Sequence, residues 1–305
     1  AGDIIVVEAD EFDRSFLTLQ PTMGLITNLD LEHLDCYKNL KDLQDAFIKF
    51  ANAVPFYGKV GVCSDHTNAV AILPHIKRPV VTFGLHKNAD VRGSNLRYNQ
   101  NQTIFDVLVK NENLGEFCIH VPGEHNVKNA LGAVTLALQL DIKVEKIQAG
   151  LDQYNGVRRR FDIKYTLENG IIIVDDYAHH PFEVTSTIQA AKSGWDRRLI
   201  TIFQPHLFTR TRDFYKDFAK AFQKADILIV TDIYQAREMP ILGITAEIIS
   251  DATKKMGHKH VEYIPDQTQI AARLSKIAES NDIIITMGAG NIWRQCERIY
   301  EAIRN

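Results

Sequence analysis

The chain has 305 residues, of which 45% are hydrophobic and 24% charged, as is typical of a globular protein with two domains. Its 35 basic and 38 acidic residues give a net charge of −3, which argues against bulk attraction to nucleic acid or to an anionic membrane. No apolar run approaches the roughly 20 residues that cross a bilayer, and the four cysteines form no C-x-x-C pair. We therefore expect no structural zinc, no disulfide framework and a cytoplasmic location.

The first 90 residues alternate predicted strands with predicted helices, which is the pattern of a parallel sheet covered by helices. Residues 4–7 (IIVV) form a continuous β-branched run and predict a strand buried on both faces. A second short strand ends at residues 27–28, and apolar residues recur on one helical face over 39–54. Two further strands cover 59–65 and 78–85, with a helix over 67–76 between them.

The pattern changes between residues 90 and 122, where strand-like stretches alternate with Asn and Gly turns. This predicts antiparallel hairpins, followed by two helices over 123–140 and 143–154. A polar, glycine-containing junction near Gly156 ends this part of the chain. We therefore predict one α/β domain over residues 1–156, with a mostly parallel sheet and an antiparallel β insertion.

The second half of the chain begins with a hairpin that turns at residues 168–170 (ENG). Regular alternation of strands and helices follows, which predicts a doubly wound α/β domain over residues 157–305, like those that bind dinucleotides. The predicted helices cover 181–194, 212–224, 245–256 and 268–279, with a last one that ends at 304, and the predicted strands cover 198–205, 226–233, 261–265 and 282–290.

Acidic residues follow each of the first two predicted strands. The first cluster is Glu8, Asp10, Glu11 and Asp13, and the second is Asp30, Glu32, His33 and Asp35. Because the carboxyl ends of parallel strands meet at one edge of a sheet, we expect both clusters to lie there. Carboxylates and an imidazole at such an edge can bind Mg²⁺, which shares its ligands with substrate phosphates. A solvated acidic loop is the alternative for either cluster alone.

A polar stretch opens the helix predicted over residues 123–140. In PGEHNVKNA, Asn126 and Asn129 share a helix face beside His125, where they could hydrogen-bond the edge of a ligand such as adenine. A capped helix with a polar surface is the alternative.

The RRRF stretch at 158–161 places three arginines at the junction, where they could bind a carboxylate or a phosphate. A solvated basic linker is the alternative.

Two acids and two histidines stand within six residues in the stretch DDYAHHP, between a predicted buried strand and a helix that Pro181 opens. They are Asp175, Asp176, His179 and His180. The next predicted strand ends in FQPHLFTRTRD, and a tight glycine-rich turn is predicted in TMGAGNI. Because ligands bind beyond the carboxyl ends of strands in open α/β sheets, we predict one crevice there, with capped turns as the alternative. Its predicted lining is Asp176, His179, His206 and Arg210.

Nine stretches of the chain resemble, in order, the motifs of the Mur ligase family. They are EADEFDRSFL, TNLDLEHLDCY, VPFYG, GEHNVKNA, GVRRRF, DDYAHHPFEV, FQPHLFTRTRDF, AREMPILG and GAGNI. Together they span residues 8–292, so the resemblance covers nearly the whole chain and is specific. Within the family, the chain is most similar to the members that join L-alanine to UDP-N-acetylmuramate.

The resemblance implies an ATP-dependent ligase of peptidoglycan precursor synthesis, with an ATPase-type central domain and an amino-acid-binding C-terminal domain. The lactyl carboxylate of UDP-N-acetylmuramate would take the γ-phosphate of ATP and become an acyl phosphate. The amine of L-alanine would then attack, and phosphate would leave from a tetrahedral intermediate. ATP and Mg²⁺ are the implied cofactors, because negative charge gathers on the transferred phosphoryl group.

The same resemblance implies roles for the candidate residues of the first domain. Glu8 would be a ligand of one Mg²⁺ near the γ-phosphate, and His33 a ligand of a second. The adenine contacts would be His125, Asn126 and Asn129.

In the second domain, the resemblance implies that Arg159 meets phosphate and that Asp176 contacts the ribose of the nucleotide. The amino-acid pocket would be Tyr177, His179, His206 and Arg210, with Arg210 on the carboxylate. The implied catalytic set is Glu8, His33, His179 and Arg210.

Two departures from the family matter. No G-x-x-x-x-G-K-[ST] phosphate loop occurs in the 305 residues, whereas the family has one after a separate UDP-binding domain. We therefore expect a fragment that lacks this domain and this loop and that is inactive alone. Leu207 stands where the family often has Arg, so one carboxylate contact is expected to be absent, which leaves the amino-acid specificity open.

Three other functions fit parts of the pattern. A sibling ligase that attaches a recycled peptide to the same sugar nucleotide shares the HHP turn. A non-catalytic binding module fits the missing phosphate loop. A metal-dependent hydrolase would use His33, Asp35, His179 and His180, although these residues fall in different predicted domains.

Overall fold

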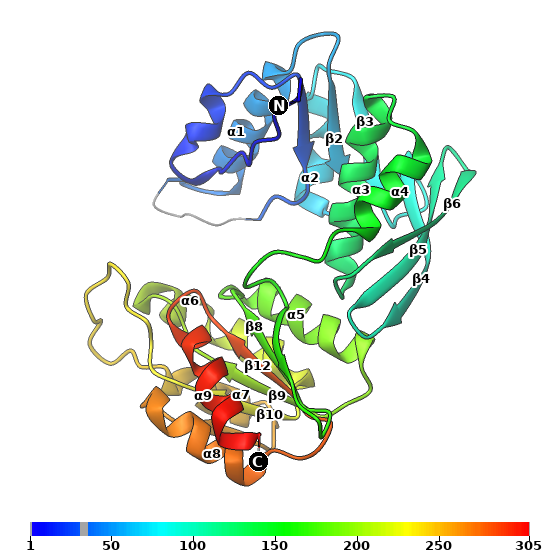
Figure 1. The fold of residues 1–305 in the computed structure, drawn as a ribbon. Coiled ribbons are helices and arrows are strands. Elements are labelled where there is room, and N and C mark those ends of the chain that lie inside the picture. Colours follow the sequence, from blue (N-terminus) through cyan, green and yellow to red (C-terminus); the bar gives the residue numbers. More distant parts are fainter. Residues whose placement is uncertain (1, 31–35, 305) are drawn as a thin grey trace. The chain divides into compact units, whose positions relative to one another are not determined.

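The computed structural model describes residues 2–30 and 36–304, and the chain divides into two compact units (Figure 1). The first unit comprises the chain up to residue 97 with 104–119 and 125–153, and the second comprises 98–103, 120–124 and the chain from 154 onward. The domain limits 1–156 and 157–305 stay a prediction, because compactness does not show which segments fold independently. None of the helices in the described residues is long and apolar enough to span a membrane.

The first unit is built on a sheet whose six strands follow one another in chain order. The pairs from β1 to β4 are parallel, as the strand and helix alternation predicts. Only two residues connect β4 to β5 and β5 to β6, and so short a connection allows only antiparallel pairing, which confirms the predicted hairpins. The strands are β1 (Met23–Ile26), β2 (Lys59–Cys63), β3 (Val80–Gly84), β4 (Val91–Asn99), β5 (Gln102–Val109) and β6 (Glu112–Ile119).

The helices of the first unit form where the apolar periodicity predicts them. At the start of α1, the Asn39 side chain accepts the backbone N–H of Asp42 at 3.0 Å, and Leu43 and Phe50 are buried on its inner face. The elements are η1 (Phe12–Thr18), α1 (Leu40–Ala53), α2 (Thr67–Ile72), η2 (Leu73–His75), α3 (Glu124–Gln139) and α4 (Val144–Asp152).

The strand predicted over residues 4–7 is wrong. These residues have no regular structure, and Val6 is 94% exposed. A β-branched run becomes a strand only where a neighbouring strand pairs with its N–H and C=O groups. In the described part of the sheet, β1 pairs with β2 and residues 4–7 pair with no strand.

The VPFYG stretch forms a tight turn between α1 and β2, closed by a 2.9 Å bond from the Gly58 N–H to the Pro55 carbonyl. A Cβ atom on Gly58 would overlap the carbonyl oxygen of Thr22 and lie 2.7 Å from Val54 Cγ1. The motif therefore needs glycine because two backbone segments meet there.

We predict that Gly58→Ala lowers the free energy of unfolding by about 1–3 kcal/mol, because the clash is with backbone that cannot move aside. Gly150→Ala in α4 is the matched control, since a Cβ there meets nothing within 4 Å. Alanine favours a helix over glycine by about 1 kcal/mol, so the control should be neutral or stabilising. Urea denaturation followed by circular dichroism checks both, and equal stability of the two variants would contradict the packing argument.

The second unit has the predicted doubly wound fold, with strand order β11-β10-β9-β12-β8-β7. Strands β8 to β12 pair in parallel, and β7 pairs antiparallel with β8 across the predicted hairpin. Every residue of β8, β9 and β12 is buried, as expected for strands covered on both faces. The strands are β7 (Asp162–Thr166), β8 (Ile172–Asp176), β9 (Leu199–Phe203), β10 (Ile227–Val230), β11 (Val261–Tyr263) and β12 (Ile283–Met287).

Helices cover both faces of this second sheet (Figure 1). Alternate strand residues point to opposite faces, so Val174 packs in a core with α5, α6 and α7, whereas Ile173 packs in a core with α8 and α9. The elements are α5 (Pro181–Gly194), α6 (Phe208–Ala221), η3 (Phe222–Lys224), α7 (Glu247–Lys255), η4 (Gln267–Gln269), α8 (Ile270–Ile277), η5 (Ile292–Arg294) and α9 (Gln295–Ile303).

Helix α6 begins at Phe208, four residues before the predicted start at Arg212. Its N-cap residue, Leu207, has no side-chain oxygen, so the local sequence gives no start signal there. The Glu238 carboxylate instead accepts the Thr209 N–H at 3.0 Å from a distant loop. A helix cap that lies 29 residues away in the sequence cannot be predicted from a local pattern.

Candidate functional site

The acidic residues after residue 7 do not all stay available for a ligand. The carboxylates of Asp10 and Asp13 accept the N–H groups of Phe12 and Ser15, at 2.9 and 3.0 Å, and so close local turns. The Glu8 side chain is exposed and accepts no hydrogen bond that the described residues show. His33, the other predicted magnesium ligand, lies outside the described residues together with Glu32 and Asp35.

Asp30, the described member of the second acidic cluster, pairs with His66, which the sequence motifs did not indicate. His66 Nε2 lies 3.1 Å from Asp30 Oδ1, and His66 Nδ1 accepts the N–H of Leu29 at 3.4 Å. An accepting Nδ1 places the ring proton on Nε2, which then donates to Asp30. His66 directly precedes α2, so the polar turn after β2 was the available signal.

Asp65, also missed, joins three segments of the first unit. Its carboxylate accepts the N–H groups of Leu85 and His86 at 2.7 and 2.8 Å, and it lies 3.8 Å from Lys128 Nζ. Lys128 stands on the first turns of α3 between Asn126 and Asn129. The predicted adenine contacts therefore lie on a helix start that is tied to the carboxyl ends of β2 and β3.

In the second unit, Asp176 holds the turn after β8. It is 5% exposed, and its two carboxylate oxygens accept the N–H groups of Phe161 and Ala178, each at 2.8 Å. Burial raises the pKa of Asp176 to about 6, against the lowering effect of those two N–H groups. The predicted contact with a ribose would have to share an oxygen that is already engaged, and it stays a prediction.

Asp175 forms a buried ion pair with Arg159. Arg159 Nε donates to Asp175 at 3.0 Å, its Nη2 donates to the Gly288 carbonyl at 2.6 Å, and its guanidinium lies 4.7 Å from the centre of the Tyr177 ring. The Thr286 hydroxyl donates to the other Asp175 oxygen at 2.9 Å. Burial raises the pKa of Asp175, and Thr286 and Arg159 partly offset this. The remaining guanidinium N–H groups of Arg159 can still meet a phosphate.

We predict that Arg159→Ala destabilises the protein by about 3–5 kcal/mol, because it leaves the fully buried Asp175 carboxylate without its charge partner. Arg158→Ala is the matched control in the same stretch, since Arg158 is exposed, and exposed substitutions usually change stability by less than about 0.5 kcal/mol. Thermal and urea denaturation measure both. An Arg159→Ala protein as stable as the control would show that the pair does not hold the turn.

Glu183 organises the two adjacent histidines. Its Oε2 accepts the backbone N–H groups of His179 and His180 at 2.9 and 3.2 Å, and its Oε1 accepts from Arg160 at 3.0 Å. Burial would raise the pKa of Glu183, but the charge and N–H of His179 together with Arg160 reverse this and lower it. Glu183 was not predicted, although a Glu three residues after a helix cap is a known capping signal.

The two histidines have different surroundings. His180 is the N-cap residue of α5, and the centroid of its ring lies 5.2 Å from that of Phe214, so it packs against α6 at the start of α5. His179 Nδ1 lies 2.9 Å from the Tyr177 carbonyl and 3.2 Å from the Glu183 carboxylate. Its ring meets those of Tyr177 and His206 edge-on, with centroids 5.1 and 5.8 Å apart.

His206 and Arg210 carry the unpaired polar atoms of this region. His206 Nδ1 and Arg210 Nη1 are buried and have no hydrogen-bond partner in the described parts of the chain. Burial, with the nearby charges of His179 and Arg210, lowers the pKa of His206 to about 4. Buried polar atoms normally find partners, so two unsatisfied ones on residues that interact electrostatically indicate a place for a ligand oxygen.

The turns around this group are fixed by close backbone approach. Gln204 donates to Asn291 Oδ1 at 3.0 Å and accepts the Ile292 N–H at 3.1 Å, which links the end of β9 to the turn after β12. A Cβ on Gly290 would lie 2.6 Å from the Tyr234 ring and would overlap the Gln204 amide oxygen. The GAGNI stretch is therefore a tight turn, as predicted.

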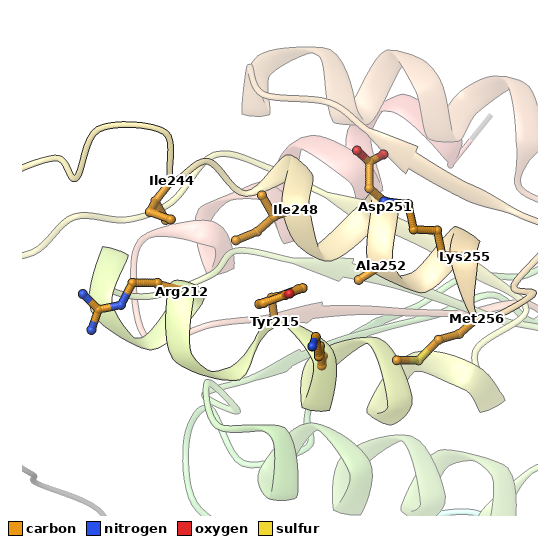
Figure 2. A pocket seen from close by; sticks show the side chains of 9 residues that line it. Arg212, Tyr215, Ile244, Ile248, Asp251, Ala252, Lys255 and Met256 are labelled. Atoms are coloured by element: carbon orange, nitrogen blue, oxygen red, sulfur yellow. The ribbon is translucent and has the colours of Figure 1, made fainter.

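Arg212 does not belong to this group. Its guanidinium is exposed and pairs with Asp213 at 2.7 Å. It lines a separate cavity of about 550 Å³ between α6 and α7 (Figure 2). Figure 2 shows Tyr215 and Met256 facing that cavity, while the Arg212 guanidinium extends away from it.

Of the predicted amino-acid pocket, the structure brings the rings of Tyr177, His179 and His206 into contact in sequence. Arg210, the fourth predicted residue, lies near enough for its charge to act on His206. Asp176 shapes the turn beneath them. The group offers two unsatisfied nitrogen positions, an imidazole and a guanidinium, beside two aromatic rings. This arrangement can bind a small carboxylate, because a guanidinium presents paired N–H donors to carboxylate oxygens.

We predict that His206 titrates near pH 4 in the folded protein, well below its ordinary value of 6.5. Because the folded state disfavours the charged ring, this group stabilises the fold fully above about pH 6.5, and that contribution is lost as the pH falls toward 4. His206→Gln should therefore flatten the dependence of stability on pH between these limits. An NMR titration of the His206 ring with a midpoint at or above 6.5 would disprove the burial argument.

Two family models match the chain in succession. The Mur ligase middle domain matches residues 2–137, and the glutamate ligase domain of Mur ligases matches residues 159–290. The two matches cover most of the first and second compact units.

Curated relatives match along nearly the full length of this chain. The UDP-N-acetylmuramate–L-alanine ligase of Geotalea daltonii is 45% identical over 303 residues, which is 99% of this chain and 66% of that protein. The ligase of the same name from Salinibacter ruber is 44% identical over 305 residues, which is 100% of this chain and 64% of that protein. The chain spans just under two thirds of the length of these relatives.

Solved structures share the fold. The UDP-N-acetylmuramate-alanine ligase of Thermotoga maritima superposes with a TM-score of 0.77 at 28% identity, over 94% of this chain and 61% of that one. A murein peptide ligase of Psychrobacter arcticus superposes with a TM-score of 0.62 at 22% identity, over 95% and 59%. These similarities confirm the predicted α/β fold class with two domains.

Proposed function

Because the chain belongs to the Mur ligase family, we propose that it carries the nucleotide-binding and amino-acid-binding parts of an ATP-dependent ligase. In this proposal the ligase joins L-alanine to the lactyl carboxylate of UDP-N-acetylmuramate, a step of peptidoglycan precursor synthesis. The relatives of that name, at 45% and 44% identity, support this pair of substrates over the recycled peptide of the sibling ligase.

One observation carries the assignment of the acceptor site. His206 and Arg210 each bury a nitrogen without a partner among the described residues. The His206 ring meets that of His179, and the charge of Arg210 acts on His206. The carboxylate of a free amino acid would satisfy both nitrogens. Leu207 adds no further cation, so we assign carboxylate recognition mainly to Arg210.

The proposed reaction has two steps. An oxygen of the lactyl carboxylate attacks the γ-phosphorus of ATP, the bond to the β-phosphate oxygen breaks, and ADP leaves. The amine nitrogen of L-alanine then attacks the acyl carbon, its proton is released, and the C–O bond to phosphate breaks. A His206 ring with a pKa of about 4 is a poor proton acceptor near neutral pH, so we assign it hydrogen bonding and not base catalysis. Glu183 orients His179 beside it.

The donor set of the first unit fits the proposed metal and nucleotide. Glu8 presents an exposed carboxylate, which is the hard oxygen ligand that Mg²⁺ prefers. When bound, Mg²⁺ neutralises charge on the nucleotide phosphates. Asn126 and Asn129 remain the proposed adenine contacts, on a helix start that Lys128 and Asp65 tie to the sheet.

The acceptor assignment is tested by Arg210→Lys, with Arg212→Lys as a control from the same helix. We expect Arg210→Lys to raise the dissociation constant for L-alanine about tenfold, since an ammonium cannot form the paired bonds of a guanidinium. Arg212→Lys should leave it unchanged, because Arg212 lines another cavity. NMR titration of the chain with L-alanine measures both. Equal effects of the two substitutions would reject Arg210 as the carboxylate contact.

Phosphate release from ATP tests the ligase reaction itself. We expect release with UDP-N-acetylmuramate and L-alanine from a protein in which this chain is joined to a G-x-x-x-x-G-K-[ST] loop segment, and none from this chain alone. A tripeptide in place of L-alanine should support little release. Preference for the tripeptide would favour the sibling ligase, and absence of release from both proteins would favour a binding module.

A further inference from the structure

The loop between β10 and α7, residues 231–246, is held against the turn that carries His206. Tyr234 N–H donates to the Pro205 carbonyl at 2.8 Å, and Leu207 N–H donates to the Tyr234 carbonyl at 3.0 Å. The His206 and Tyr234 rings stack with centroids 5.8 Å apart and an interplanar angle of 15°. The loop thus forms one wall of the turn after β9.

The same loop supplies the cap of α6. Glu238 Oε2 accepts the Thr209 N–H at 3.0 Å, and Glu238 Oε1 accepts the Thr209 hydroxyl. The first N–H groups of a helix have no partner within the helix and need one from outside. The N-cap residue Leu207 cannot supply it, and its φ of 71° is in the left-handed region that disfavours a leucine. Glu238 therefore fixes a helix start that its own sequence does not stabilise.

The position of this cap matters because Arg210 follows Thr209 directly. Both Glu238 oxygens are engaged by Thr209, and no ion pair between Glu238 and Arg210 occurs in the described structure. The Glu238 carboxylate therefore bonds the helix start and does not pair with the guanidinium. Arg210 keeps a buried nitrogen for another acceptor.

We propose that Glu238 is a positioning residue for the acceptor amino acid. It holds the first turn of α6 so that Arg210 faces the site and no ion pair with Glu238 neutralises its charge. This inference rests on the proposed function, since it takes Arg210 as the contact for the acceptor carboxylate. Nothing in the local sequence of α6 provides a substitute, because the cap comes from the AREMPILG stretch.

The test compares Glu238→Ala and Glu238→Gln with Glu247→Ala, an exposed glutamate in the first turn of α7. The dissociation constants for L-alanine and for ATP are measured by NMR titration of the 305-residue chain, with thermal midpoints alongside. We expect Glu238→Ala to weaken L-alanine binding about tenfold and Glu238→Gln about threefold, because the amide oxygen can still accept the Thr209 N–H. ATP binding should not change, and Glu247→Ala should match the wild type in both.

The outcomes distinguish a failure of this inference from a failure of the proposed function on which it rests. If the wild type binds L-alanine and Glu238→Ala binds it equally well despite a lower thermal midpoint, Glu238 is only a helix cap and the inference fails. If the wild type binds no L-alanine, the proposed acceptor site fails and takes the inference with it. Should Glu238→Ala not fold, Glu238→Gln decides by the same comparison.

Discussion

Carboxylates that accept hydrogen bonds from backbone N–H groups hold the strand-end turns of both units. Asp65 does so for Leu85 and His86 in the first unit, and Asp176 for Phe161 and Ala178 in the second. Turns and helix starts leave N–H groups that regular structure does not satisfy, and a buried unsatisfied N–H costs about as much as a lost hydrogen bond. The shape of each candidate site therefore depends on acids that do not themselves need to touch a ligand.

The same constraint decides which charged groups of the second site stay available to a ligand. Asp175, Asp176 and Glu183 are engaged by Arg159, by backbone N–H groups and by Arg160. With the acids occupied in this way, the buried atoms without a partner among the described residues of the predicted pocket are nitrogens of His206 and Arg210. The region is rich in acidic residues by composition, yet it presents donors to an incoming ligand. The two aspartates of the stretch DDYAHHP would by themselves have suggested a site that presents acceptors.

Sequence patterns predicted those parts of the fold whose determinants are local. The hairpin at 168–170, the buried strands of the second unit and the helix over 39–54 follow from turn chemistry and apolar periodicity. Residues 4–7 have the composition of a strand, but pairing with a neighbour decides whether a strand forms, and composition does not contain that information. The start of α6 was misplaced for the same reason, since its cap lies on another segment.

The candidate residues themselves could be selected by motif, but their partners could not. Tyr177, His179 and His206 do lie together, as their strand-end positions predict. Glu238 bonds across 29 residues and Asp65 across 20, and no spacing rule links such pairs. Sequence reasoning placed Asp176 at a ligand, which stays a prediction, but it did not show that Asp176 holds the N–H groups of Phe161 and Ala178 or that Asp175 pairs with Arg159. Glu183 could have been found from its capping position, but Glu238 and Asp65 could not, because the groups that they hold are distant in the sequence.

The helix cap that Glu238 supplies to α6 from another segment has a consequence for moving or redesigning this site. A segment such as FQPHLFTRTRDF looks self-contained, because it holds the histidine and the arginine that face the ligand. Its helix start is stabilised only when the segment around Glu238 is present and correctly folded. The transferable unit is therefore a pair of segments that are distant in the chain, and a graft or a chimaera that exchanges one without the other would keep the recognition residues and lose their geometry.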